Sequence, residues 1–415
     1  MKTGCGINEG TGYVYYLNFS PEADEVWQEI ASEYTAQTGV PVKVVTAASG
    51  SYSDTLTAQM CKNDCPTLFA IRTTQELNDW DKYCYDLTGT KFADMLETTD
   101  NCLYDDEGRM CAVGYCTQSY GIITNLSLLK KSGHSTDEIH DFASLKTVVE
   151  DIHRRRGELG FDAFTSSGLD PSSSWRFSGH LASIPLYYEF RDKSFTTQPD
   201  RIDGTYLDFY KNIWDLYINN SSTSPGELSS ATGDLAEEEF GSGKAVFYQN
   251  GSWEYPALTS EDKYAMDPED LAMIPIYIGI DGENNAGLCT GTEDCWAVNS
   301  HTDQANIDAT LDFLYWMVSS DRGRKMMADQ FGVTPFKGHI ESDNLFISDA
   351  EQMEKQGKYN VNWAFKYTPN TETWRLGVVS ALEGYSSGKA DWDEVVSAFV
   401  NGWNYQYKLE HCILD

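Results

Sequence analysis

The chain has 415 residues, 41% of them hydrophobic and 23% charged, so it can bury sizeable cores, and two domains of about 100–200 residues are expected. Its formal net charge is −34, from 30 Lys and Arg against 64 Asp and Glu. Such a chain repels the phosphates of nucleic acids and the headgroups of anionic lipids, so neither is an expected partner. The simplest explanation of the charge is solubility in an exposed environment.

The first residues are glycine-rich and polar, and we expect residues 1–10 to form a tether. Within them, Thr3-Gly4-Cys5-Gly6 matches the end of a bacterial lipobox, whose cysteine becomes the lipid-modified first residue of the mature protein. A chance cysteine in a tail explains the same pattern, and the sequence leaves both interpretations open. No run of about 18 apolar residues occurs, so no transmembrane helix is expected.

Strand-like and helix-like segments alternate in the first part of the chain. Strands are predicted at residues 13–17, 42–45 and 68–71, and amphipathic helices at residues 22–37, stopped by Gly39, and 54–60. This alternation predicts βαβ units and a parallel sheet. Ligands of such sheets bind beyond the carboxyl ends of the strands, which here are the loops at residues 18–22, 49–52 and 72–75.

The rest of the chain predicts further elements. Residues 111–125 indicate mixed strand and loop, and a candidate crossover between domains. Helices are expected at residues 142–155, where the Arg-Arg-Arg-Gly of 154–157 would end the helix, and at residues 206–217, 237–243, 307–318 and 392–403. Residues 170–174 form a loop with N-cap chemistry before Trp175, and a strand at 246–248 is expected to turn at Asn250-Gly251.

The cysteines predict disulfides or buried thiols rather than a metal site, because their spacing gives no four-ligand zinc set and no His lies nearby. Residues 105–108 have the composition of a hairpin turn, so we expect Cys102 and Cys111 to lie opposite one another and form a bridge. Cys61–Cys65 is a weaker candidate. The ten cysteines are Cys5, Cys61, Cys65, Cys84, Cys102, Cys111, Cys116, Cys289, Cys295 and Cys412.

No catalytic motif is readable in the sequence. Gly241-Ser242-Gly243-Lys244 lacks the spacing of a phosphate-binding loop and precedes a strand, and no G-x-S-x-G elbow is present with a suitable His and acid. Carboxylates are so frequent that a glycosidase pair cannot be picked out. We therefore expect no enzyme and no cofactor.

Several segments in order resemble one protein family over roughly residues 13–405. KAVFYQNGSW (residues 244–253) resembles the "G-K-A-A-M…N-G-x-W" segment of bacterial extracellular solute-binding proteins of the maltose-binding-like class. VYYLNFSPE (14–22) resembles their first strand and loop. FLYW (313–316) with GVTPF (332–336), TETW (371–374) and residues 391–403 are similar to their C-terminal part.

The resemblance implies a two-lobed α/β fold, periplasmic-binding-protein-like, with discontinuous lobes joined by a hinge and the ligand cleft between them. The first lobe would comprise residues 11–123 and 286–333, and the second residues 124–285 and 334–415. Matching the family's motifs residue by residue gives the expected ligand-binding positions: Asn18, Glu22, Ser49, Ser51, Tyr52, Gln118, Tyr120, Trp175, Arg176, Trp253, Glu293 and Trp374. The alternative for each aromatic residue is a place in the core, and for Glu22 a solvated first turn of a helix.

The function that the resemblance implies is an extracellular, monomeric sugar receptor that closes about its hinge and delivers its ligand to the membrane permease of an ABC importer. Sugars fit the residue types, because pyranose C–H faces stack on Trp and Tyr while hydroxyls need polar partners. Lipidation of Cys5 would anchor the receptor at the cell surface. Two alternatives stay open: a secreted carbohydrate-active enzyme (glycosidase or lyase) and, more weakly, a receptor for peptides or metals.

Overall fold

The computed structural model describes residues 12–48, 50–292 and 294–413, and the chain divides into two compact units. Unit 1 is Met1–Thr117 with Thr292–Asp343, and unit 2 is Gln118–Gly291 with Asn344–Asp415. These limits differ by several residues from the expected ones, because β6 (Gln118–Asn125) and β10 (Ala286–Gly291) each lie whole in the sheet of unit 2. The expected tether lies outside the described residues.

Unit 1 contains a six-stranded sheet in the order β2-β1-β3-β11-β5-β4. β1 pairs in parallel with both β2 and β3, which confirms the βαβ units expected from the sequence. β11 then pairs antiparallel with β3 and β5, so a strand from the second stretch of the unit lies inside the sheet and joins its two parts. The strands are β1 (Val14–Asn18), β2 (Val42–Thr46), β3 (Leu68–Ile71), β4 (Cys102–Tyr104), β5 (Met110–Gly114) and β11 (Cys295–Val298).

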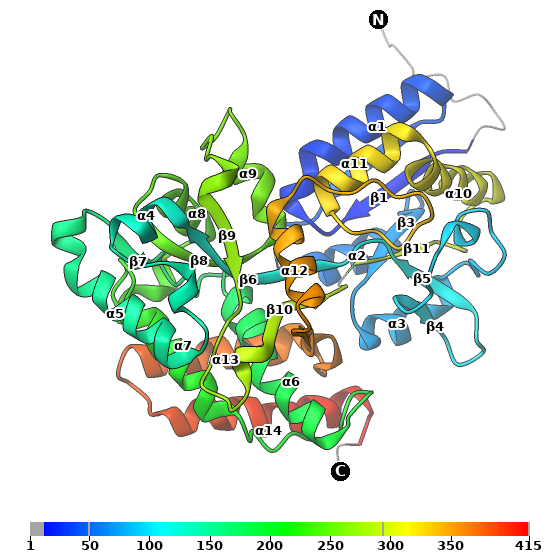
Figure 1. Ribbon diagram of the computed structural model, residues 1–415. Helices are drawn as coiled ribbons and strands as arrows, with labels where there is room; N and C mark the ends of the chain where they lie inside the picture. The colour runs from blue at the N-terminus through cyan, green and yellow to red at the C-terminus, as the bar shows by residue number, and fades with distance from the viewer. Residues whose placement is uncertain (1–11, 49, 293, 414–415) are drawn as a thin grey trace, which may run out of the picture. The chain divides into compact units, whose positions relative to one another are not determined.

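Helices cover both faces of this sheet (Figure 1). Successive strand residues point to opposite faces, so Tyr16 packs with α1, α10 and α11, while its neighbour Leu17 packs with α2 and α3. α1 ends where Gly39 adopts a left-handed φ of 77°, as expected. The helices are α1 (Asp24–Thr38), α2 (Tyr52–Met60), α3 (Thr74–Trp80), α10 (Gln304–Ser319) and α11 (Asp321–Phe331), with short turns η1 (Pro21–Ala23), η2 (Asp81–Tyr83) and η3 (Ala93–Met95).

Unit 2 contains a second mixed sheet, in the order β12-β10-β6-β8-β7, with β9 also paired to β6. β6 lies at its centre and is antiparallel to β8, β9 and β10. The remaining strands are β7 (Asp162–Phe164), β8 (Ala245–Gly251), β9 (Leu271–Ile274) and β12 (Tyr359–Asn362).

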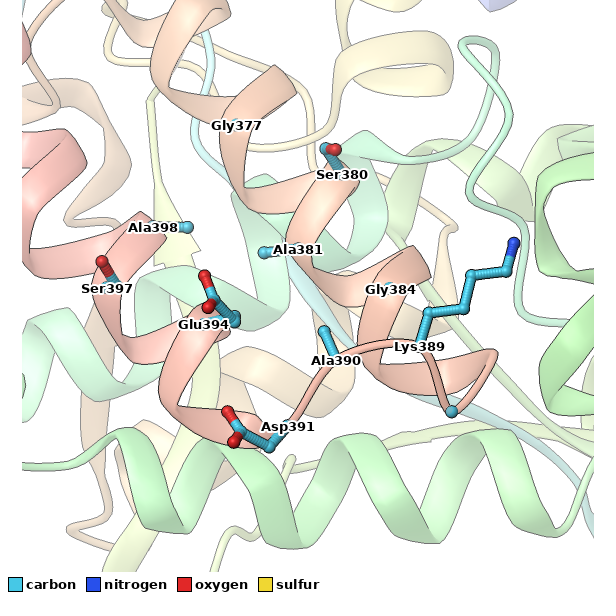
Figure 2. Close-up of a pocket in the computed structure, with 11 residues that line it drawn as sticks. Gly377, Ser380, Ala381, Gly384, Lys389, Ala390, Asp391, Glu394, Ser397 and Ala398 are labelled. Carbon is cyan, nitrogen blue, oxygen red and sulfur yellow. The ribbon is translucent and has the colours of Figure 1, made fainter.

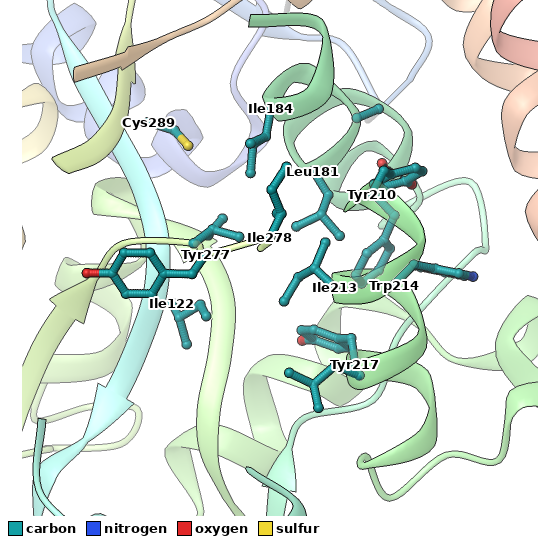
Figure 3. Close-up of a cluster of buried hydrophobic side chains, with 14 of the residues drawn as sticks. Ile122, Leu181, Ile184, Tyr210, Ile213, Trp214, Tyr217, Tyr277, Ile278 and Cys289 are labelled. Atoms are coloured by element: carbon teal, nitrogen blue, oxygen red, sulfur yellow. Dashed lines mark hydrogen bonds between the residues drawn. The ribbon is translucent and has the colours of Figure 1, made fainter. Parts of the chain in front are cut away.

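The helices of unit 2 also pack on both faces of the sheet. Figure 3 shows part of the larger core, where Ile122 of β6 and aromatic side chains of α7 gather with the segment around Leu181. A smaller core on the other face joins Ile123 and Tyr248 to α8, α9 and α12. The helices are α4 (Leu126–Lys131), α5 (Phe142–Leu159), α6 (Ala182–Lys193), α7 (Leu207–Asn219), α8 (Gly233–Gly241), α9 (Tyr255–Thr259), α12 (Leu345–Lys355), α13 (Thr371–Ser386) and α14 (Trp392–Glu410).

Two sequence expectations for these elements are wrong in detail. α5 runs on past the Arg-Arg-Arg-Gly run to Gly160, whose left-handed φ of 82° ends the helix. Asn250 and Gly251 do not turn the chain, because both still pair with β6; the turn follows as η7 (Ser252–Glu254). The other short helical turns are η4 (Thr136–Glu138), η5 (Arg176–Leu181), η6 (Pro225–Ser230), η8 (Pro268–Asp270), η9 (Glu283–Asn285) and η10 (Phe365–Tyr367).

The expected Cys102–Cys111 bridge is also wrong, although the hairpin itself exists as β4 and β5. Cys102 lies opposite Val113 instead of Cys111, because Tyr104 already pairs with Met110 and the register shifts by one more residue between Leu103 and Tyr104. A bulge of this kind changes which face a side chain occupies. Cys102 accordingly packs against the core beneath α1 and α10, while Cys111 lies in the core on the other face, and no disulfide joins the two.

Candidate functional site

An aromatic wall lies in unit 2, and we define it as Trp175, His180 and Trp253. The two tryptophans are half-buried, and their ring centroids are 6.1 Å apart. His180 contacts both, with ring centroids 4.8 Å from Trp175 and 5.3 Å from Trp253. Two tryptophans with part of their surface open, held at one place, form a surface on which a flat apolar face can stack.

His180 lies behind the two tryptophans of the wall and is itself held by stacking. Its ring is parallel to that of Tyr120, with centroids 4.1 Å apart and an interplanar angle of 5°, and Trp363 stacks beyond at 6.0 Å. The hydroxyl of Tyr120 donates to the backbone carbonyl of His180 at 2.9 Å. Burial, together with the charges of Arg375 and Arg176, holds the pKa of His180 well below its usual value. The imidazole is therefore neutral and acts as a ring, not as a charge.

The segment that carries Trp175 and His180 is wound in an unusual way. Asp170 accepts a hydrogen bond from the backbone of Ser172 at 3.0 Å, and the Trp175 indole donates to the Ser172 carbonyl at 2.9 Å. Residues Arg176–Leu181 then form a π-helix, which leads into α6. Pro185 of α6 has no N–H to donate one turn back, which favours the wider winding just before it. Such π-turns often occur at functional sites.

Trp253 is held by the end of β8. Its six-membered ring lies directly over Gly251, at a distance that leaves no room for a side chain there. Asn344, the N-cap of α12, donates to the carbonyl of Ser252 at 2.8 Å, and Asn250 donates to Glu254 at 2.8 Å. Both ends of η7 are therefore fixed, and the tryptophan between them is pre-positioned.

Polar groups gather at the carboxyl ends of β1 and β3 in unit 1. Arg72 follows β3, forms an ion pair with Glu76, and lies over the ring of Phe19 at 4.4 Å. Asp294 accepts hydrogen bonds from Tyr115 at 3.1 Å and from Ser20 at 3.2 Å. Its second oxygen, Oδ1, has no partner among the described residues. Burial raises the pKa of Asp294 to about 7, although the charge of Arg72 and these hydrogen bonds lower it.

Several expected ligand-binding residues are interior and hold the protein together instead. Asn18 is inaccessible and shapes its own loop, donating to Ser20 and Thr46. Tyr52 is buried and its hydroxyl is bonded to the backbone of Ala70. Trp374 is 2% exposed and packs in the core against Phe399. In the structure these three side chains are therefore buried and present almost no surface to solvent.

Arg176 and Tyr120 are interior as well. Arg176 is 1% exposed, and its guanidinium donates to the carbonyls of Gln249 and Ser166, each at 3.2 Å. Tyr120 is also inaccessible, and it supports His180 as described above. Both residues therefore position the wall and do not form its surface.

The remaining expected residues divide by their placement. Trp175 and Trp253 come together in the wall. Ser51 and Gln118 are half-buried and Glu22 is exposed, so their side chains retain access to solvent. Ser49 and Glu293 lie outside the described residues.

Four residues in these places were not among the expected ligand-binding residues: Arg72, Asp294, His180 and Trp363. Arg72 nevertheless begins the loop at residues 72–75, which was expected at the ligand-binding edge of the sheet. Asp294 follows directly on Glu293, which was singled out, so that segment carried a readable signal. Nothing in the pattern distinguished His180, because its role depends on the π-helix and on stacking with a distant strand.

A groove of about 830 Å³ between α13 and α14 is a separate feature of unit 2 (Figure 2). Small residues such as Gly377, Ala381 and Ala398 line it, together with Lys389 and Glu394. It holds none of the expected ligand-binding residues and no aromatic ring. The groove therefore lacks a stacking surface, and the aromatic wall is the better candidate for a ligand contact.

Comparison with protein families assigns the chain. Residues 29–355, well over half of it, match the model of the bacterial extracellular solute-binding proteins. The chain belongs to this family. No curated protein sequence matches it significantly.

Solved structures of similar fold support the assignment of this solute-binding protein at the level of architecture. The solute-binding protein RafE in complex with raffinose has 18% identity and a TM-score of 0.72, covering 96% of this chain and 100% of its own. The GacH receptor of Streptomyces glaucescens, whose structure was determined unliganded and in complex with acarbose, has 18% identity and a TM-score of 0.72. The match covers 96% of this chain and 99% of the receptor. A sugar transporter from Bacillus licheniformis in complex with stachyose has 16% identity and a TM-score of 0.68. The match covers 95% of this chain and 100% of that protein.

Two further observations concern the described part of the solute-binding protein. None of its helices there combines the length and apolar character that crossing a membrane requires. Among the same residues, no three His, Cys, Asp or Glu side chains come together in an arrangement that would hold a metal ion.

Proposed function

We propose that this solute-binding protein captures a neutral mono- or oligosaccharide on the aromatic wall of unit 2 and delivers it to the membrane permease of an ABC importer. The observation that carries the proposal is the pair of half-buried tryptophans, Trp175 and Trp253, backed by the neutral ring of His180. The family assignment supports an extracellular binding role. The hinge closure expected from the resemblance stays a prediction.

A sugar matches this surface better than other small solutes. The C–H face of a pyranose is apolar and flat, and it stacks on indole rings. Solved relatives of the same fold bind raffinose, acarbose or stachyose, all of which are carbohydrates. The net charge of −34 disfavours an anionic ligand, so we expect an uncharged sugar.

A thermal-shift screen with raffinose, stachyose, maltose and galactose tests this proposal. A ligand that binds only the folded protein stabilises it by about 2.7 kcal/mol at a hundredfold excess over Kd, which gives a visible rise in Tm. Glutamate and a short peptide serve as controls, because neither offers a pyranose face. A rise with the controls and none with a broadened sugar panel would contradict the proposal.

The alternative of a carbohydrate-active enzyme is tested with the same protein. A glycosidase needs an acid of raised pKa opposite a second carboxylate, and none of the three residues of the aromatic wall is a carboxylic acid. We expect the bound oligosaccharide to be recovered intact after prolonged incubation. Chromatographic detection of shorter products, absent in a heat-denatured control, would favour the enzyme.

We also propose that the receptor acts as a monomer anchored at the cell surface by a lipid on Cys5, which lies outside the described residues. The lipobox-like Thr3-Gly4-Cys5-Gly6 and the family assignment support the anchor. Mass spectrometry of the protein exported by a bacterial host should show an N-terminal diacylglyceryl cysteine, lost in Cys5→Ser. Release of unmodified protein into the medium by both forms would contradict the anchor.

A further inference from the structure

Cys84 and Cys111 meet although 26 residues of sequence separate them. Cys84 follows η2, and its backbone forms an isolated antiparallel β-bridge with that of Asn299, just beyond the end of β11. Three residues later, Leu87 donates its backbone N–H to the carbonyl of Met110 at 3.0 Å. The loop after Cys84 is therefore tied to β5 at the residue directly before Cys111.

The two thiols share one environment. Cys84 is 1% exposed and Cys111 is inaccessible, and both belong to the core packed under α2 and α3. The thiol of one forms a hydrogen bond with the thiol of the other, and Cys84 also donates to the carbonyl of Trp80 at 3.3 Å. The bulge in β5 matters here, because it turns Cys111 toward this core and away from Cys102.

We propose that Cys84 and Cys111 are joined by a structural disulfide in the exported protein. Members of this family work outside the cytoplasm, where disulfides form and persist. The contact between the thiols, their shared core and the tie between Leu87 and Met110 bring the two chain segments together. The bridge would fasten the loop after α3 to the central sheet of unit 1.

The chemistry is a thiol–disulfide exchange with a low-molecular-weight disulfide, such as oxidised glutathione, during folding. The thiolate of Cys111 attacks one sulfur of this disulfide, releases the first thiolate and forms a mixed disulfide. The deprotonated sulfur of Cys84 then attacks the Cys111 sulfur, releases the second thiolate and closes the bridge. Two protein thiols are oxidised, one external disulfide is reduced to two thiols, and the two protons pass to the released thiolates.

The two thiols differ in the direction of their pKa shifts in the folded protein. The hydrogen bond with Cys84 lowers the pKa of Cys111, assisted by the charge of Arg109 against the effect of burial. The same hydrogen bond, together with burial, raises the pKa of Cys84.

A peptide map tests the pairing directly. The full-length protein is refolded in a glutathione redox buffer, free thiols are alkylated under denaturing conditions, and the chain is cut with trypsin. Because trypsin cuts after Lys82, Lys91, Arg109 and Lys130, the proposal predicts residues 83–91 joined to residues 110–130, with fragment ions locating the bond at Cys111 and not Cys116. Alkylated Cys84 and Cys111, or residues 92–109 joined to 110–130 through Cys102, would overturn it.

Thermal unfolding gives a second readout, which begins with the wild-type protein alone. Reduction of the oxidised wild-type protein should lower its Tm by about 5–10 °C, the range expected for opening a loop of this length. The same treatment should not shift Cys84→Ser, whereas the control Cys102→Ser should respond like wild type. An equal response to reductant in Cys84→Ser and wild type would contradict the bridge.

Discussion

The six-membered ring of Trp253 lies so close over Gly251 that a Cβ on Gly251 would stand 2.2 Å from Cη2 and Cζ3 of the indole. Two carbon atoms that are not bonded to each other cannot lie this close. The position of the Trp253 ring therefore depends on the absence of a side chain at residue 251. Gly251 ends β8 with a φ of −121°, which any residue can adopt. The glycine is thus needed for the close approach of a ring and not for its backbone conformation.

Gly251→Ala should therefore displace Trp253 and leave the fold intact. The indole is half-buried and can rotate away, so the melting temperature without ligand should change little, while sugar affinity should fall by about tenfold or more. Gly226→Ala is the matched control, because a Cβ there meets no atom within 4 Å. Calorimetric titration of both variants compares them, and an unchanged affinity in Gly251→Ala would separate Trp253 from the binding site.

Removing the indole itself is the stronger change. Trp253→Ala should weaken sugar binding at least roughly 30-fold, since loss of an aromatic anchor in a desolvated site costs about 2 kcal/mol or more. Trp316→Ala, which removes a half-buried tryptophan from unit 1, should retain the wild-type affinity. Parallel melting curves without ligand decide the matter: a Trp253→Ala protein that loses binding because it unfolds would place this residue in the core.

Trp374→Ala should behave in the opposite way. Trp374 is 2% exposed, donates its indole N–H to the carbonyl of Phe399 at 3.1 Å, and contacts Trp403 edge to face. Its removal should cost about 3–5 kcal/mol of unfolding free energy, through lost contacts and a cavity. Denaturant unfolding measures this. If the variant were as stable as wild type but did not bind sugar, Trp374 would be a ligand contact after all.

Asp294 should make the stability of the protein depend on pH. Burial raises its pKa from 3.8 to about 7, so between these values the folded state holds a proton that the unfolded state has lost. The free energy of unfolding should therefore fall as the pH rises from about 4 to 7, by about 1.4 kcal/mol for each pKa unit of difference. Denaturant titrations at several pH values follow this trend.

Asp294→Asn removes the titration and keeps an oxygen that Tyr115 and Ser20 can bond. Its stability should depend less on pH over the same window, and at pH 8 the variant should be more stable than wild type, because no charge is buried. Identical pH profiles for the two proteins would show that Asp294 does not titrate as described.

The sequence predicted the parts of the fold that depend on local pattern. The parallel pairing of β1, β2 and β3 follows from alternating strand and helix signals, and the end of α1 follows from Gly39. The bulge in β5 has no such signal, because it is set by how Met110, Cys111 and Val113 pack between two cores. Cys102 therefore lies opposite Val113, two residues beyond Cys111, and Cys111 packs in the same core as Cys84.

The candidate site was also predictable only in part. Trp175 and Trp253 were named from loops next to predicted structure, and the structure brings them together. Tyr52, Tyr120 and Trp374 have the same residue types, and only their tertiary packing makes them interior. A sequence shows which aromatic residues follow strands and turns, whereas burial depends on partners far along the chain.

Isothermal titration calorimetry of wild type and Trp175→Ala/Trp253→Ala shows whether this solute-binding protein binds a neutral sugar on its aromatic wall. The titrations use each sugar of the thermal-shift panel. We expect saturable binding of at least one sugar to wild type with one site per chain, and at least a hundredfold weaker binding to a double variant that melts like wild type. Equal affinities in the two proteins, or no heat from any sugar with folded wild type, would contradict it.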